Sequence, residues 1–102
     1  MSEIPKSHPR YNSLISRERL VQASKDGLLA ESAMIAHGRG EAFDYLLGEK
    51  TSISALKSIK EVAGRLRRAK SPVISVNGNT AVLAGEELIK IAAMISCPIE
   101  IN

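Results

Sequence analysis

Hydrophobic residues recur every three to four positions along three stretches of the chain, which is the spacing of amphipathic helices. They predict helices over about residues 13–25, 30–47 and 51–70. The third is the clearest, with Thr51 or Ser52 as its N-cap. Its predicted buried stripe consists of Ala55, Leu56, Ile59, Val62, Ala63 and Leu66. Two prolines in residues 1–12 predict an extended arm before these helices.

The pattern changes in the last third of the chain. An apolar run follows Pro72 and stops at Asn77-Gly78-Asn79, which predicts a buried strand entering a tight turn, with Gly78 free to take a positive φ. A helix over about residues 85–96 and a second strand over residues 98–102 are predicted next. The expected fold class is therefore α/β: a helical segment over 13–70, then a βαβ unit over 71–102. Its sheet is incomplete, because two parallel strands do not stand alone.

Composition sets limits on the function. A chain of 102 residues with 44% apolar residues suits one small globular domain, and a net charge of +3 permits an anionic ligand without demanding nucleic acid. Cys97 is the only cysteine, so the chain has no internal disulfide and no cysteine pair for a metal. No apolar run is long enough for a membrane span and no signal sequence is evident, which predicts a cytoplasmic protein without a membrane partner.

The arm carries the first candidate for ligand binding. His8, Arg10 and Tyr11 place an imidazole, a guanidinium and a phenol within four positions. Together they offer a bidentate fork and oriented donors, which suit a phosphate or a carboxylate. The alternative is a solvated tail.

A second candidate lies in the middle of the second helix, where two glycines flank Arg39. Glycine is unfavourable inside a helix, so the pair predicts a break or a surface that a ligand approaches closely, with Arg39 projecting into the space. Glu41 and Asp44 share a helical face and are expected to orient Arg39 or His37. A metal site is not expected there, since no further ligands accompany them.

The end of the first strand is the third candidate. In open α/β sheets, ligands bind at the carboxyl ends of strands against free backbone N–H groups, which makes Asn77, Gly78 and Asn79 possible binding residues. An ordinary turn without a ligand is the alternative. The basic cluster over residues 65–70 suits a helix C-terminus, and no aromatic platform accompanies it as a nucleic-acid binder would require.

Several of these segments resemble the archaeal 4-phosphopantoate–β-alanine ligases, also called phosphopantothenate synthetases. The resemblance rests on residues 7–14, on Arg17-x-Arg19, on residues 37–49 and on residues 72–79. The run Gly-Arg-Gly-Glu-Ala-Phe-Asp-Tyr-Leu-Leu-Gly-Glu is the most specific of them.

The resemblance implies an enzyme that uses ATP, with Mg²⁺, to join 4-phosphopantoate to β-alanine through a phosphopantoyl-adenylate. It also implies a homodimer with a Rossmann-like core, and ATP contacts from arginines that match Arg17 and Arg39. His8, Arg10, Tyr11, Asn77, Gly78 and Asn79 remain possible substrate-binding residues on their local chemistry alone. No residue is assigned a catalytic role.

Members of that family continue well past the last residue of this chain. The sequence therefore predicts an N-terminal part that is inactive alone, and it leaves open a fragment, a protein whose other half is encoded separately, and a decayed remnant. The alternatives are a noncatalytic dimerisation or nucleotide-binding module and, less favoured, a small nucleic-acid binder that uses residues 65–70.

Overall fold

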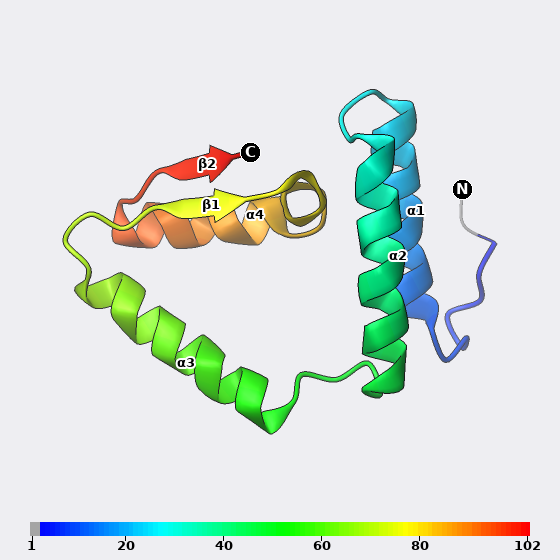
Figure 1. The fold of residues 1–102 in the computed structure, drawn as a ribbon, viewed down its shortest axis with the longest axis horizontal. Helices are drawn as coiled ribbons and strands as arrows, with labels where there is room; N and C mark the ends of the chain where they lie inside the picture. The colour runs from blue at the N-terminus through cyan, green and yellow to red at the C-terminus, as the bar shows by residue number, and fades with distance from the viewer. Residues whose placement is uncertain (1–2) are drawn as a thin grey trace.

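The computed structural model describes residues 3–102, and its helices and strands place this part of the chain in the α/β class. In chain order the elements are α1 (Tyr11–Lys25), α2 (Glu31–Leu46), α3 (Ile53–Arg68), β1 (Ile74–Val76), α4 (Gly78–Ile95) and β2 (Ile99–Ile101). Figure 1 shows α1 and α2 side by side, with α3 leading away from them to a unit made of β1, α4 and β2. None of the helices in this range combines the length and apolarity of a membrane span.

The α1–α2 hairpin contributes half of the buried hydrophobic residues of the described chain, and the other half, Val76, Ala92 and Cys97, belongs to residues 74–101. Gly27 has a φ of 77° in the connection between the two helices, a conformation that glycine adopts without strain. Leu20 is fully buried and packs with Ala23 and Leu29. Partly buried residues from α2 and from the start of α4 complete this cluster: Ala33, Met34, Val82 and Leu83. The hydrophobic core therefore lies where the hairpin meets α4.

The β1–α4–β2 unit has the predicted strand–helix–strand order. The two strands pair in parallel, with Ile74 opposite Ile99 and Val76 opposite Ile101. Helix α4 connects them along one face of the sheet (Figure 1). It ends at Ser96, whose φ of 52° and ψ of 49° form a left-handed cap.

Helix α3 forms as predicted but does not bury its apolar stripe. Ser52 is the N-cap, and its Oγ accepts a hydrogen bond of 3.1 Å from the Ala55 N–H. Leu56, Ile59 and Val62 are nevertheless 48%, 57% and 55% exposed. The predicted buried stripe is therefore wrong for this chain, because no element of residues 3–102 covers it.

The corner after β1 differs from the prediction. Instead of a tight turn, Asn77 is the N-cap of α4, and its Oδ1 accepts a hydrogen bond of 2.9 Å from the Thr80 N–H. Helix α4 thus begins at Gly78 rather than near residue 85, and it bends at Ala84, whose φ of −132° and ψ of 15° are not helical. Gly78 does not have the positive φ that was expected.

The extent of α2 is confirmed, but one of the two alternatives for its glycine pair and the extended form of the arm are wrong. Helix α2 runs without a break past Gly38 and Gly40, since sixteen residues form one helix. Before α1, the chain makes hydrogen-bonded turns rather than an extended arm, with the His8 N–H bonded to the Pro5 carbonyl at 2.9 Å. Residues 1–2 of the predicted arm lie outside the described part of the chain.

Candidate functional site

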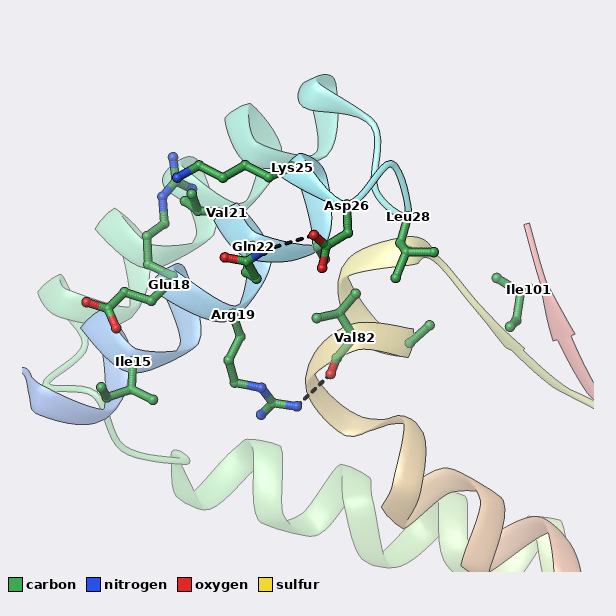
Figure 2. Close-up of a pocket in the computed structure, with 14 residues that line it drawn as sticks. Ile15, Glu18, Arg19, Val21, Gln22, Lys25, Asp26, Leu28, Val82 and Ile101 are labelled. Atoms are coloured by element: carbon green, nitrogen blue, oxygen red, sulfur yellow. Dashed lines mark hydrogen bonds between the residues drawn. The ribbon is translucent and has the colours of Figure 1, made fainter. Parts of the chain in front are cut away.

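An open groove of about 940 Å³ lies between α1 and the beginning of α4. We call it the α1–α4 groove; Figure 2 shows it with the residues that line it. Helix α1 supplies most of the lining, and α4 adds Gly78, Ala81 and Val82. Gly78 lies two residues after Val76, the last residue of β1, and directly after Asn77, the N-cap of α4. The groove therefore reaches the carboxyl end of β1, where open α/β sheets bind ligands.

The lining of this groove combines an apolar floor with charged edges. Val21, Leu28 and Val82 contribute apolar surface. Three cationic side chains and two carboxylates also line the groove: Arg17, Arg19, Lys25, Glu18 and Asp26. One positive charge remains after these five are summed, and the backbone N–H groups at the start of α4 add a favourable dipole for an anion. Such a groove suits an anion with an apolar body.

Arg19 connects the two sides of the groove. Its Nη2 donates a hydrogen bond of 2.7 Å to the carbonyl oxygen of Val82 in α4 (Figure 2). Nearby, the side-chain amide of Gln22 donates to Asp26 at 2.9 Å, so this acidic group is held along α1. Arg19 was absent from the predicted site residues. Helical spacing places Arg19 on one face of α1 with Ile15, Gln22 and Asp26, but it does not reveal that this face meets the Val82 carbonyl.

Arg17, a predicted ATP contact, reaches from α1 to α2. Its Nη1 donates to the Met34 carbonyl at 2.7 Å and lies 3.2 Å from Nδ1 of His37. Arginine is only a donor, so this contact is a hydrogen bond in the tautomer in which Nδ1 of His37 accepts. Arg17 also lines the groove, and its role toward ATP stays a prediction.

Arg39, the second predicted ATP contact, lies away from Arg17. It follows His37 by two positions, which is about 200° around the helix, so the two side chains leave α2 in nearly opposite directions. Arg39 is exposed, and its neighbours along the helix, Ile35 and Phe43, are 63% and 69% exposed. The described residues of one chain therefore do not bring the two arginines together.

Arg10 is held by two carboxylates. Its Nε donates to Glu49 at 2.7 Å, its Nη2 lies 3.4 Å from Glu41, and its guanidinium lies 5.1 Å from the centre of the Tyr45 ring. Hydrogen bonds from Arg10 and then from Ser13 lower the pKa of Glu49, and the Glu49 bond raises the pKa of Arg10. The prediction that Glu41 orients Arg39 or His37 is wrong, because Glu41 pairs with Arg10.

The other predicted substrate-binding residues divide between two places. His8 accepts a hydrogen bond of 3.0 Å from the Arg10 N–H through its Nδ1, and Tyr11 begins α1; neither lines the groove. Asn79 turns inward, and its Nδ2 donates to the Ala33 carbonyl at 3.0 Å. Of the three corner residues only Gly78 lines the groove.

A second, smaller hollow of about 390 Å³ lies beside α1 and α2. Its lining includes the polar side chains of Ser13, Ser16, His37, Glu41 and Asp44. These acidic groups do not form a metal site: within residues 3–102, no three or more His, Cys, Asp or Glu side chains are placed to hold an ion.

Comparison with known proteins identifies the sequence family. A family model described as phosphopantothenate/pantothenate synthetase matches residues 54–102. A protein of Methanospirillum hungatei named 4-phosphopantoate–β-alanine ligase is 54% identical over 97% of this chain. Proteins with the same name from Thermococcus onnurineus and Methanosarcina mazei are 47% and 44% identical over the whole chain. The chain belongs to this family.

The aligned region covers almost all of this chain but less than half of each relative. The chain spans 41%, 39% and 40% of the lengths of these three ligases. The family model covers α3 and the β1–α4–β2 unit, whereas the ligases also match the α1–α2 hairpin, so both sides of the groove belong to the shared sequence.

Proposed function

We propose that this chain is part of an ATP-dependent ligase that joins 4-phosphopantoate to β-alanine and forms 4'-phosphopantothenate for coenzyme A biosynthesis. The observation that carries the proposal is the 44–54% identity to ligases of this name over 97–100% of the chain. The aligned region includes the residues of the α1–α4 groove. Because the chain spans about two fifths of those relatives, the activity is proposed for the protein with the remaining family sequence present.

The α1–α4 groove is the proposed binding place for 4-phosphopantoate. This substrate has an anionic group at each end of a dimethyl-substituted carbon chain, which matches an apolar floor edged by Arg17, Arg19 and Lys25. The backbone N–H groups of Gly78 and Asn79 are the proposed further donors to a phosphate oxygen, because the N–H groups of Thr80 and Ala81 are bonded to Asn77. His8, Arg10 and Tyr11 have no place in this proposal, since they lie outside the groove.

Arg17 and Arg39 are proposed as ATP contacts. Arg39 leaves α2 in nearly the opposite direction from His37, which contacts Arg17, and this supports a homodimer in which one nucleotide meets Arg17 of one copy and Arg39 of the other. Mg²⁺ would be held largely by the triphosphate oxygens, as is usual for this ion, because the described residues offer no carboxylate cluster. We further propose that the parallel pair β1 and β2 belongs to a larger Rossmann-like sheet, since a two-stranded sheet needs more strands for stability.

The proposed reaction has two steps. A carboxylate oxygen of 4-phosphopantoate attacks the α-phosphorus of ATP and pyrophosphate leaves; the β-alanine amine then attacks the acyl carbon and AMP leaves. Cationic and N–H donors stabilise the charge that develops on phosphorus, which is the part that groove residues of this chain can perform.

The test is pyrophosphate release from ATP, 4-phosphopantoate and β-alanine. We expect no turnover from the 102-residue chain alone and turnover when it is mixed with the unmatched remainder of the Methanospirillum hungatei ligase. In the active mixture, Arg39→Lys should weaken ATP binding by on the order of 1.5–3 kcal/mol, because lysine lacks the planar fork. Sustained turnover by the chain alone would show that these 102 residues are a complete enzyme.

A noncatalytic nucleotide-binding or dimerisation module is the second candidate, favoured by the partial coverage of the relatives. The same mixture separates the two functions. A module binds ATP or forms a dimer, but it releases no pyrophosphate with any combination of the three substrates.

A further inference from the structure

The first turns of α4, residues 78–83, are joined to the α1–α2 hairpin by three contacts of different kinds. The side chain of Leu29 packs over Gly78 so closely that a Cβ on Gly78 would lie 2.7 Å from Leu29 Cδ1. Asn79 Nδ2 donates to the Ala33 carbonyl, and Arg19 Nη2 donates to the Val82 carbonyl. One contact comes from α1, one from the connection and one from α2, so the segment is fixed from three directions.

The Arg19 contact lies beside the bend in α4. Ala84 leaves the helical region, so residues 78–83 form a short helical segment that ends one residue after Val82. Carbonyl groups at the end of a helical segment lack the regular partners of the interior, and a cation is favourable there. The guanidinium of Arg19 supplies both a hydrogen-bond donor, at 2.7 Å from the Val82 carbonyl oxygen, and a positive charge.

Asn79 makes its contact at a cost in stability. Its Nδ2 is bonded to Ala33, whereas its Oδ1 is buried and has no hydrogen-bond partner in the described part of the chain. A buried amide oxygen without a partner is destabilising, and an apolar residue of similar size would remove this penalty. The feature that an apolar residue could not reproduce is the hydrogen bond to Ala33, which forms a directional link between α4 and α2.

We propose that Asn79 and Arg19 are positioning residues that fix the first turns of α4 against the hairpin and thereby set the shape of the α1–α4 groove. Neither residue needs to touch the reacting atoms. Arg19 lines the groove directly. Asn79 does not line it, and it acts through its neighbour Gly78, which does. The placement of α4 is independent of any reaction, while its consequence for an anionic substrate rests on the proposed function.

The first experiment follows amide hydrogen exchange by NMR in the 102-residue chain. Asn79→Leu and Arg19→Met should each raise exchange in residues 80–83 about tenfold, with amides of α1 and α3 unchanged. Asn79→Leu should leave the melting temperature unchanged or higher, because it removes the unpaired oxygen. Arg19→Lys should restore most of the protection, since an ammonium group also donates to a carbonyl. Arg65→Met, which alters an exposed arginine of α3, is the matched control.

Two results would overturn the inference. One is unchanged exchange in residues 80–83 of Asn79→Leu and Arg19→Met; the other is an equal increase in every helix, which indicates general destabilisation. In the complemented ligase, Asn79→Leu should raise KM for 4-phosphopantoate about tenfold with a smaller change in kcat, and an unchanged KM would remove the link to the groove. Absence of turnover in the unsubstituted mixture would instead count against the proposed function, and the exchange result would stand.

Discussion

Helices α1 and α3 are nearly equal in length but differ in how much of their surface the rest of the fold buries. Helix α3 has the sharper separation of apolar from polar residues, yet it buries none of its side chains, whereas α1 buries Leu20 and Ala23. The difference lies in their neighbours: α1 packs against α2 and α4, and no element of residues 3–102 packs broadly on α3. An amphipathic pattern thus predicts that a helix has an apolar face, and says nothing about whether the same chain supplies its cover.

The largest expected difference is between the buried Leu20 of α1 and the exposed Ile59 of α3. Leu20→Ala should lower the free energy of unfolding by about 2–5 kcal/mol, because it leaves a cavity at the only fully buried large side chain of residues 3–102. Ile59→Ala should cost well under about 1 kcal/mol in the same urea titration, since Ile59 is already more than half exposed. Equal losses would show that α3 is covered in solution.

The next effect concerns two glycines of α4. Gly78→Val should lower stability by about 1–3 kcal/mol, because its side chain meets Leu29. Gly85→Ala is the control: no atom lies within 4 Å of the added Cβ, so the helix should gain about 0.5–1 kcal/mol. If Gly78→Val is harmless, Leu29 moves freely and the close packing of the corner is not needed. Leu29→Ala should partly rescue Gly78→Val in a double-mutant cycle.

Smaller effects are expected at the two N-caps. Asn77→Ala and Ser52→Ala each remove an acceptor for a first-turn N–H, a loss worth about 0.5–2 kcal/mol of helix stability. Because α4 contributes to the core and α3 does not, Asn77→Ala should lower the melting temperature of the whole domain. Ser52→Ala should mainly increase amide exchange within α3 and lower the melting temperature much less than Asn77→Ala does. An equal fall in melting temperature from the two substitutions would place α3 in the core and contradict the comparison.

The smallest effect is a pH dependence at the end of α2. Because Arg10 and Ser13 lower the pKa of Glu49, the charged form stabilises the fold. This contribution is fully present above the usual glutamate value of about 4.3 and is lost as the pH falls through the lower folded pKa. Arg10→Met should raise the Glu49 pKa, measured by NMR titration of its carboxyl carbon. An unchanged value would show that the contact is not maintained in solution.

Local sequence signals predicted much of the fold correctly. The Ser52 cap, the existence of four helices, the strand after Pro72 and the strand–helix–strand order are all visible as spacing and turn chemistry. The predictions were wrong where tertiary contacts, rather than local sequence, determine the role of a residue. Gly78 was interpreted as a residue that needs a positive φ, but it adopts a helical conformation and its small size serves the approach of Leu29. Nothing in the local sequence reveals a neighbour that lies almost fifty positions earlier.

The residues of the candidate site were harder to predict from the sequence than the fold. Arg10 was selected as an anion ligand, although Glu49 and Glu41 already occupy its donors. The pairing of these residues depends on how the α1–α2 hairpin closes, which periodicity does not specify. Arg19 was passed over because its partner is a backbone carbonyl, and carbonyl groups have no signature in a sequence.

The bond between Asn79 and Ala33 joins positions 46 residues apart and therefore closes a loop that contains most of α2, all of α3 and β1. In polymer terms, closing a flexible loop of this length is opposed by the loss of chain configurations. A stiff α3 has already given up many of those configurations before closure, so it reduces the entropy that docking of α4 must overcome. A helix that touches almost nothing can in this way still strengthen a contact at a distance.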